Sequence, residues 1–268
     1  MKKKIKIAVC GALGRMGRLI IKEIQNNKIV SLESAIVNKY DKNINKEVGK
    51  VLKIKPTKIV FQPKIKKSNN FDVLIDFTTP EKTIENVLYC QKNSKKIVIG
   101  TTGFSNLEMN FIKKASKKTS ILYSSNFSIG INLMIKLLGT ITKSIGKTSD
   151  IEIIESHHKN KIDAPSGTAI SLGKKIAACM NWNYEKSAIY DRHVKKSKRK
   201  KREIGFSSLR IGNLAGKHSV IFANNNEILK IKHEAVNRKI FSKGAVLASI
   251  WLHKQKNGLF NMQDVLKI

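Results

Sequence analysis

One short stretch of the sequence, ESHHKNKIDAPSGTA at residues 155–169, gathers side chains that bind anions and transfer protons. His157 and His158 are adjacent, and Lys161 comes four residues after the first of them. An imidazole titrates near neutral pH and can act as an acid or a base, and an ammonium group attracts carboxylates. This combination predicts a site for an anionic substrate that gains or loses a proton.

A turn of four residues, Pro165, Ser166, Gly167 and Thr168, follows this lysine. If a helix begins at the turn, its unpaired backbone N–H groups and the Thr168 hydroxyl form a carboxylate site. Asp163 either braces a lysine or caps the turn. An imidazole, an ammonium group and a helix N-terminus together can bind a dianion.

The histidine pair has other interpretations. Neighbouring residues of an extended chain point in opposite directions, so one imidazole can face a substrate while the other packs elsewhere. No H-x-x-x-H spacing or converging acid cluster accompanies the pair, so we expect no metal. An isolated His-His pair is more often structural or exposed, and Lys159 belongs to the general lysine background. The order of residues in this stretch favours a substrate site.

A second candidate site lies near the start of the chain, in IAVCGALGRMGRLI at residues 7–20. Gly11, Gly14 and Gly17 come directly after an apolar strand and open a helical pattern. In a dinucleotide site such glycines permit the tight turn, the close approach of the pyrophosphate and the packing of helix on strand. A plain glycine-rich turn is the alternative, but the strand-loop-helix context favours dinucleotide binding.

The end of the second strand bears on the choice of cofactor. Residues 34–42, SAIVNKYDK, place Val37 and Asn38 where an NAD-specific fold usually has an Asp or Glu for the ribose hydroxyls. Lys39 and Lys42 can instead attract a 2′-phosphate, which favours NADPH. Alternatively, these lysines belong to the general bias and neither NADPH nor NADH is strongly selected.

The residues of both candidate sites must be positioned by strands and helices of the fold. In the first half, β-branched runs alternate with helical patterns, which is typical of β-α-β units and a parallel sheet. We expect a Rossmann-like, doubly wound dinucleotide-binding domain over residues 1–127. Its expected strands are 5–10, 30–37, 71–77, 96–100 and 120–123, with a helix from Pro80 to about Lys92.

The second half lacks this alternation and predicts a mixed α+β domain for substrate binding and oligomerisation over residues 128–237. The fold class is therefore α/β with a second, mixed domain. The expected elements are a helix at 129–145, a strand at 150–156, a helix at 167–178 and three antiparallel-looking strands at 204–212, 218–223 and 227–235. We expect residues 238–268, with an amphipathic helix at 243–255, to complete the first domain.

The composition is that of a folded protein with unusual charge. Apolar residues make up 41% and charged residues 26%, which excludes disordered and collagen-like classes. The net charge of +33 comes from lysines spread along the whole chain, which indicates a bias in residue usage more than a nucleic-acid groove. The basic run from Lys195 to Arg202 is interpreted as a solvated loop.

The cysteines and the apolar segments bear on location. Cys10, Cys90 and Cys179 are widely spaced and include no C-x-x-C pair, which predicts neither disulfides nor a zinc site. The basic start runs into glycines instead of a cleavage site, and no apolar segment approaches membrane-spanning length. We expect a soluble, cytoplasmic protein with no membrane and no nucleic-acid partner.

Several motifs together resemble one family. The segments CGALGRMG, DFTTPE, IGTTGF, SSNFSIGIN, ESHHKNKIDAPSGTA and GLFNMQDVL are similar to the bacterial 4-hydroxy-tetrahydrodipicolinate reductase (dihydrodipicolinate reductase) family, nearly end to end and in its order. The resemblance implies NADPH- or NADH-dependent reduction of 4-hydroxy-tetrahydrodipicolinate, through dihydrodipicolinate, to tetrahydrodipicolinate in the diaminopimelate route to lysine. It also implies a homotetramer assembled through the second domain and a cyclic dicarboxylate substrate.

The resemblance assigns roles to individual residues. It implies that His157 is the acid/base group, that Lys161 is the proton donor, and that His158, Lys161, Gly167 and Thr168 grip the substrate carboxylates. The implied cofactor positions are Gly11, Ala12, Leu13, Gly14, Arg15, Met16, Gly100, Thr101, Thr102, Ser124, Ser125, Asn126 and Phe127.

The sequence departs from the family pattern in two places. Val37 and Asn38 stand where members often have Glu and Arg, and the loop around Lys195 to Arg202 lacks the expected glycines. The residue pattern alone leaves two alternatives to an enzyme open. One is a sensor that binds nicotinamide nucleotide without turnover, and the other is a basic nucleic-acid-binding protein.

Overall fold

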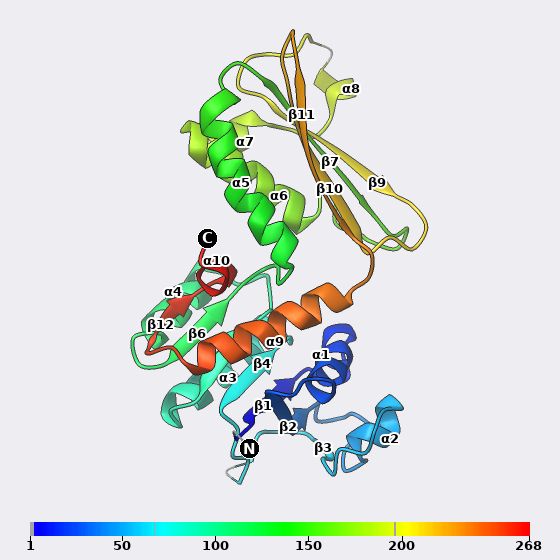
Figure 1. Cartoon of the computed structure of the whole chain (residues 1–268), viewed down its shortest axis with the longest axis vertical. Helices are drawn as coiled ribbons and strands as arrows, with labels where there is room; N and C mark the ends of the chain where they lie inside the picture. Colours follow the sequence, from blue (N-terminus) through cyan, green and yellow to red (C-terminus); the bar gives the residue numbers. More distant parts are fainter. Residues whose placement is uncertain (1–2, 67, 196) are drawn as a thin grey trace. The chain divides into compact units, whose positions relative to one another are not determined.

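A computed structural model describes residues 3–66, 68–195 and 197–268 (Figure 1). The chain forms two compact units. The first unit consists of Met1–Ile129 and Lys239–Lys267, and the second of Gly130–Arg238. Each unit has its own sheet and its own hydrophobic core.

The first unit is built on a parallel sheet of seven strands in the order β12-β6-β5-β4-β1-β2-β3. From β1 the chain adds β2 and β3 on one side, then returns to add β4, β5, β6 and β12 on the other, so the predicted doubly wound sheet is confirmed. The strands are β1 (Ile5–Cys10), β2 (Val30–Ile36), β3 (Phe61–Gln62), β4 (Val73–Asp76), β5 (Lys96–Ile99), β6 (Ser120–Tyr123) and β12 (Gly258–Phe260).

Helices cover both faces of this sheet, which is why its central strands are apolar runs. Ile7 and Val9 face the core under α1 (Arg15–Gln25) and α9 (Lys239–His253). Ala8 and Cys10 alternate with them and face the core under α3 (Pro80–Lys92) and α4 (Asn106–Ala115). Figure 1 shows α9 crossing the sheet beside α1, and α9 belongs to the first unit.

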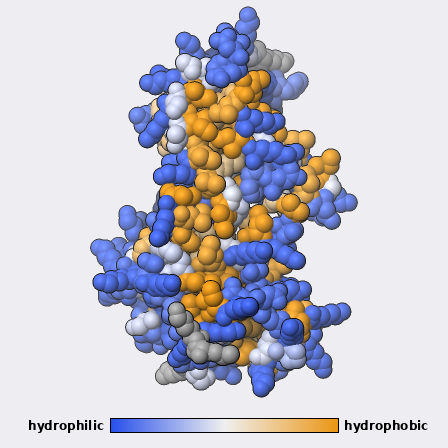
Figure 2. Space-filling view, in the orientation of Figure 1, coloured by the Kyte–Doolittle hydropathy of each residue, from blue (hydrophilic) through white to orange (hydrophobic). Residues whose placement is uncertain are grey.

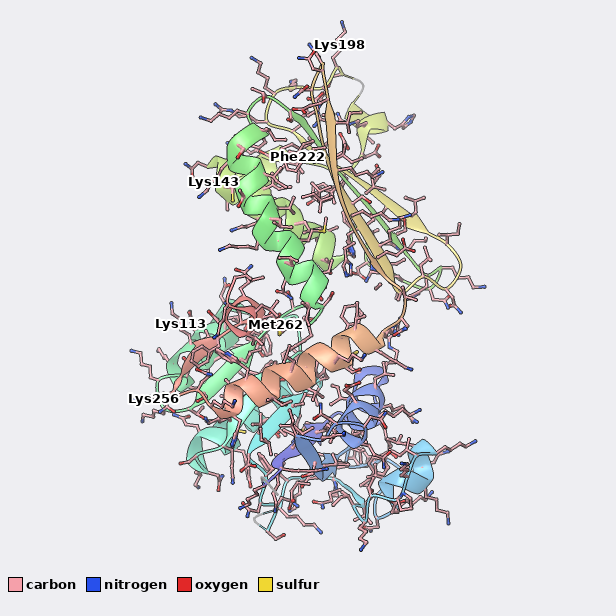
Figure 3. The ribbon with its side chains drawn as sticks, viewed as in Figure 1. Lys113, Lys143, Lys198, Phe222, Lys256 and Met262 are labelled. Atoms are coloured by element: carbon pink, nitrogen blue, oxygen red, sulfur yellow. The ribbon has the colours of Figure 1, made fainter. Side chains whose placement is uncertain are left out.

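The second unit is built on a five-stranded sheet in the order β11-β10-β7-β9-β8. Helices α5 (Ile129–Ile145) and α6 (Gly167–Met180) pack on one face of this sheet, and Figure 3 shows Phe222 directed from β10 into this core. The strands are β7 (Asp150–His157), β8 (Ala188–Ile189), β9 (Ile204–Arg210), β10 (Gly216–Ala223) and β11 (Ile228–Ala235).

One predicted strand direction was wrong. β10 pairs antiparallel with β7 and β11 as expected, but β9 runs parallel to β7 and to β8. The connection from β7 to β9 passes through α6 and is long enough for a parallel crossover, which a hairpin turn does not allow. The sheet is therefore mixed.

Several predicted boundaries also need correction. The strands expected at 30–37, 71–77 and 96–100 are shorter, and β7 runs one residue further than expected, to His157. Sequence reasoning missed α4, and the missed short elements are α2 (Val48–Leu52), α7 (Tyr184–Ser187), α8 (Arg192–Lys195), α10 (Met262–Leu266), β3, β8 and β12. Most of them are too short to show a hydrophobic period.

The basic run does not consist only of solvated side chains. Lys195 ends α8, residue 196 lies outside the described residues, and Lys198, Lys200, Lys201 and Arg202 are exposed. Arg199 instead forms ion pairs with Asp150 and Glu152 and donates to the Ile151 carbonyl at 2.9 Å. The interpretation as a solvated loop was therefore wrong for Arg199, because acids on β7 neutralise its charge.

The remaining lysines are broadly distributed. Lys113, Lys143, Lys198 and Lys256 are exposed and extend outward in Figure 3. Figure 2 shows hydrophilic side chains over both units on the visible face. Among the described residues, no helix combines the length and apolar character that crossing a bilayer requires.

Candidate active site

Three predicted cofactor segments meet at one edge of the first sheet. Residues 11–16 follow β1, residues 100–102 follow β5, and residues 124–127 follow β6. These strands and β4 are consecutive and parallel, so their carboxyl ends lie on the same edge. In open α/β sheets ligands bind at this edge, next to the point where strand order reverses.

The glycine loop needs its glycines for space. Gly11 has a φ of +75°, and a Cβ there would lie 2.4 Å from the Phe77 carbonyl oxygen. A Cβ on Gly17 would lie 2.1 Å from the Gly11 carbonyl oxygen, so α1 can approach the loop only without a side chain at this position. Gly14 precedes α1 and provides no side chain to cap the helix. The start of α1 is thus suited to a phosphate group, which fits a dinucleotide.

The turn after β5 is joined to the turn after β4. Thr101 is buried, and its hydroxyl oxygen accepts the Thr78 backbone N–H at 3.0 Å and lies 2.9 Å from the Thr83 hydroxyl. The Thr78 hydroxyl in turn donates to Asp76 at 2.6 Å. Thr101 therefore supports the neighbouring turn, whereas the side chain of Thr102 is exposed.

Asp76 was missed by sequence reasoning although it organises these turns. Its carboxylate is fully buried at the end of β4 and also accepts a hydrogen bond from the Asn86 amide at 3.0 Å. Burial raises the pKa of Asp76 above its ordinary value, although the hydrogen bonds from Thr78 and Asn86 act in the other direction. The available signal was an acidic residue at the end of an apolar strand, in the sequence Asp-Phe-Thr-Thr-Pro.

The turn after β6 is partly structural. The Ser124 hydroxyl donates to the Asn126 carbonyl at 2.8 Å, and the Asn126 side chain accepts the Ser128 backbone N–H at 2.8 Å. Phe127 is buried with its ring 5.5 Å from that of Phe77. Ser125 is the exposed member of this predicted set.

A cavity of about 830 Å³ opens beside β1, β2 and β4. Gly11, Val37 and Asn38 line it, together with Lys39 and Lys64. The lining contains one described carboxylate, that of Glu85, whose oxygen lies 2.6 Å from the Lys82 ammonium. Lys42, which was expected to attract a phosphate, is not among the described lining residues.

The two histidines of the second unit point in different directions, as expected for neighbours on a strand. His157 ends β7 and is only 8% exposed, and its Nδ1 hydrogen bonds to the Glu155 carboxylate. His158 instead approaches Arg238, whose guanidinium nitrogen lies 3.1 Å from His158 Nε2. Glu155 and His157 share a face because they are two residues apart on β7.

Glu155 accepts hydrogen bonds from several segments. Its Oε1 accepts from Arg210 Nη2 at 2.8 Å and from the Ser166 backbone N–H at 3.4 Å. Burial by itself would raise the pKa of Glu155, but hydrogen bonds from His157, Arg210 and Ser208 outweigh it and lower the pKa to about 2. The carboxylate is therefore ionised at neutral pH.

Lys161 lies in the turn after the histidines. Its ammonium group contacts both carboxylate oxygens of Asp163, at 2.7 and 2.8 Å, so Asp163 braces this lysine. The Lys161 carbonyl accepts from Arg210 Nε at 3.2 Å. Lys159 is exposed, in agreement with its assignment to the background.

The predicted helix start after the turn is confirmed. Helix α6 begins at Gly167, after a cis peptide bond between Ala164 and Pro165. The Ser166 hydroxyl caps the helix by accepting the Ala169 N–H at 3.2 Å. A Cβ on Gly167 would meet nothing within 4 Å, so the surface over the first helical residue is open, and Thr168 beside it is half-buried.

His218 on β10 is a further member of this site that sequence reasoning missed. Its ring lies 5.1 Å from that of His157, edge to face, and its Nε2 lies 3.1 Å from the Ser166 hydroxyl. Burial lowers its pKa to about 4, and the neighbouring His157 acts in the same direction. The sequence signal for an inward His218 was the alternation of side chains along β10, where His218, Val220 and Phe222 occupy every second position and point inward.

Glu155, His157 and His218 also have the geometry of metal ligands, with donor atoms within 4.8 Å of one another. The sequence had led us to expect no metal. The carboxylate already accepts hydrogen bonds from His157, Arg210 and Ser166, and the Arg210 guanidinium opposes a cation. These contacts support a hydrogen-bond network better than a metal centre.

The buried groups make acid stability predictable. We expect the free energy of unfolding to fall as the pH is lowered from about 6.5 to about 4, because unfolded His218 takes up a proton in this window and folded His218 does not. Glu155 should continue the loss from about 4.5 to about 2, because its folded pKa lies below its unfolded value. Urea denaturation at a series of pH values measures both windows.

A His218→Gln variant provides the control for the upper window. It should flatten the pH dependence between about 6.5 and 4, leaving a smaller slope from His233, whose pKa is also lowered by burial. Identical slopes in the variant and the natural protein would contradict the assignment to His218.

Comparison with known proteins agrees with both units. Residues 5–127 match the family model described as dihydrodipicolinate reductase, N-terminus, and residues 130–266 match the model of its C-terminus. A 4-hydroxy-tetrahydrodipicolinate reductase from Buchnera aphidicola subsp. Cinara cedri (strain Cc) is 51% identical, with 100% of this chain and 98% of the relative covered. The relative of the same description from Buchnera aphidicola subsp. Acyrthosiphon pisum (strain APS) is 48% identical, with 100% of each chain covered.

Solved structures show the same fold. Dipicolinate-bound dihydrodipicolinate reductase from Paenisporosarcina sp. TG-14 matches with a TM-score of 0.78 at 23% identity, over 98% of this chain and 99% of that one. An amine dehydrogenase from Mycobacterium smegmatis matches with a TM-score of 0.70 at 8% identity, over 97% of this chain and 96% of that one. With family models covering both units and full-length relatives near 50% identity, the chain belongs to the dihydrodipicolinate reductase family.

Proposed function

We propose that the chain reduces 4-hydroxy-tetrahydrodipicolinate, through dihydrodipicolinate, to tetrahydrodipicolinate, using His157 and Lys161 for proton transfer. The observation that carries this proposal is the grouping, within residues 155–169, of a buried imidazole, an ammonium group and an open helix start. The names of the full-length relatives favour this reaction over a sensor without turnover or a nucleic-acid-binding protein. The diaminopimelate route to lysine is the corresponding pathway.

The second unit supplies charge for a dicarboxylate. Lys161 and the partly buried pair of His158 and Arg238 are cationic or proton-donating groups, and Gly167 and Thr168 begin α6. We assign the substrate carboxylates to His158, Lys161, Gly167 and Thr168. The related Paenisporosarcina enzyme was solved with dipicolinate, which is itself a cyclic dicarboxylate.

The proton transfers follow from the surroundings of each group. Loss of the 4-hydroxyl as water would give dihydrodipicolinate, and a reduced nicotinamide bound in the first unit would supply the hydride to C4 of this cyclic imine. The Lys161 ammonium group contacts both carboxylate oxygens of Asp163, and Lys161 is assigned as the proton donor that completes the reduction. His157 is assigned as the acid/base group beside it. Fixing the substrate by both carboxylates can lower the barrier by several kcal/mol, with about 7 to 11 as an upper range.

Replacement of the proton-transfer residues tests these roles. We expect His157→Ala and Lys161→Ala to lower kcat by roughly 10²- to 10⁴-fold, because each removes a proton-transfer group. Lys161→Ala should also raise KM for the substrate, because a carboxylate partner is lost. NADPH oxidation with the condensation product of pyruvate and aspartate semialdehyde measures both constants.

The matched control is Lys159→Ala, which removes an exposed lysine from the same segment and should leave kcat unchanged. Normal turnover in both site variants would rule out the proposed mechanism. Cofactor binding without any turnover by the natural chain would instead support the sensor.

The nicotinamide cofactor binds in the first unit, and we assign it to Gly11–Met16, Gly100–Thr102 and Ser124–Phe127 with a preference for NADPH over NADH. The preference for NADPH is supported by the lining of the cavity beside β2, which includes Lys39 and Lys64. The carboxylate described in this lining, that of Glu85, is paired with Lys82. The 2′-phosphate distinguishes the two cofactors and attracts free ammonium groups.

Lysine removal tests this preference. Lys39→Ala and Lys64→Ala should each raise KM for NADPH by up to about fivefold and leave KM for NADH nearly unchanged, because an exposed ion pair contributes about 0.2 to 1 kcal/mol. Lys42→Ala, which removes a lysine outside the described lining, is the control. Equal effects on the two cofactors would contradict 2′-phosphate recognition.

We also infer a homotetramer that assembles through the sheet of the second unit. Helices α5 and α6 pack on this sheet, but three large apolar side chains of its strands remain exposed. They are Leu209 on β9 (47% exposed) and Ile228 and Leu229 on β11 (71% and 40% exposed). Light scattering should give the mass of four chains of 30.1 kDa, and Ile228→Asp with Leu229→Asp should lower it. A monomeric mass for the natural chain would contradict the inference.

A further inference from the structure

We propose that Glu155 is a positioning residue that holds three parts of the substrate site in register through one buried carboxylate. These parts are His157 on β7, the Lys161 turn reached through Arg210 on β9, and the start of α6 at Ser166. The inference rests on the proposed function, in which His157 and Lys161 transfer protons. It adds two residues, Glu155 and Arg210, to which no role had been assigned.

The first step concerns the tautomer of His157. An ionised carboxylate only accepts hydrogen bonds, so its contact with His157 Nδ1 places a proton on Nδ1. Nε2 is then the atom that exchanges a proton with the substrate. Gly216 lies on the Nε2 side, where a Cβ would come within 3.0 Å of that nitrogen. The absence of a side chain at Gly216 leaves the reactive nitrogen uncrowded.

The second step concerns the lysine turn. Parallel pairing of β7 and β9 sets His157 opposite Arg210. From there the guanidinium donates to Glu155 Oε1 at 2.8 Å, to the Asp163 carbonyl at 2.6 Å and to the Lys161 carbonyl at 3.2 Å. One planar group thus joins the carboxylate that orients His157 to the backbone that carries the Lys161 ammonium.

The third step concerns the helix start. The Ser166 backbone N–H donates to the same Oε1 at 3.4 Å, and the Ser166 hydroxyl caps α6. His218 contacts this hydroxyl from the other side at 3.1 Å. The start of α6, at Gly167 and Thr168, is therefore fixed relative to His157 through Glu155.

The charges around Glu155 favour this arrangement. A buried carboxylate is costly unless it is paired and hydrogen-bonded, and here Arg210 supplies the opposite charge. The other titratable or charged groups around it are His157 on β7, His218 on β10, and Lys161 and Asp163 on the turn, and His233 on β11 lies beyond His218. Because the pKa of Glu155 is about 2, it stays ionised across neutral assay conditions.

Glu155→Gln tests the tautomer directly. The amide keeps the size of the side chain, but only one of its two polar atoms is an acceptor. The carboxylate accepts from both Arg210 and His157 Nδ1, so in the variant an NH₂ group must face one of these two donors. We expect ¹⁵N NMR of the imidazoles to show His157 losing its Nδ1–H tautomer. Turnover should fall about 10- to 100-fold, as when the partner of an oriented histidine is removed. The dissociation constant of NADPH should not change.

Glu152→Gln is the matched control. Glu152 lies on the same strand and also pairs with arginines, Arg192 and Arg199, but it has no contact with the histidine site among the described interactions. It should leave the His157 tautomer and kcat unchanged. Arg210→Lys provides a second route if Glu155→Gln folds poorly, because a lysine keeps the charge but not the planar set of donors. It should lower kcat while preserving the Nδ1–H tautomer.

The outcomes separate this inference from the proposed function. An unchanged His157 tautomer together with unchanged kcat in Glu155→Gln would overturn the positioning role and leave the reaction intact. A natural protein with the Nδ1–H tautomer but no turnover of the cyclic substrate would overturn the proposed function, while loss of that tautomer in Glu155→Gln would still support the positioning role.

Discussion

The candidate site in the second unit depends on one ion pair between Glu155 and Arg210, with a nitrogen-oxygen distance of 2.8 Å. A carboxylate that is 1% exposed cannot remain charged there without a cation and further donors. The sheet supplies both, because parallel strands bring the arginine beside the histidine strand. The same contacts that stabilise the charge also fix the atoms to which the chemistry is assigned, so folding and site geometry share one set of hydrogen bonds.

The first unit uses a second buried carboxylate in a comparable way. Asp76 joins its own turn to that of Thr101 through the Thr78 hydroxyl. The difference lies in the pairing. Asp76 has hydrogen bonds from neutral groups, and burial raises its pKa, whereas Glu155 has a guanidinium partner and a lowered pKa. Hydrogen bonds from neutral groups suffice for Asp76 to fix two turns, whereas Glu155, with its guanidinium partner, also orients an imidazole.

The sequence was sufficient for features that depend on local patterns. The β-α alternation, the glycine loop and the start of α6 after Ser166 follow from spacing and residue type. The direction of β9 did not, because a period of two residues is the same in parallel and antiparallel strands. The pairing of Arg210 with Glu155 spans 55 positions and depends on that direction, so no local signal identified it. Alternation along β10 indicates that His218 points inward, but only the pairing of β10 with β7 shows that it lies beside His157.

The parallel pairing of β7 with β9 has a consequence for how this chain can vary by insertion and deletion. The connection between the two strands contains α6, α7, α8 and a stretch of exposed lysines, and length changes in its exposed part need not disturb the sheet. Within Ile204–Arg210 the situation is different, because inserting one residue would turn Arg210 to the opposite face and leave Glu155 without its cation. The exposed part of this connection can therefore change in length, whereas the spacing within β9 must be kept residue by residue.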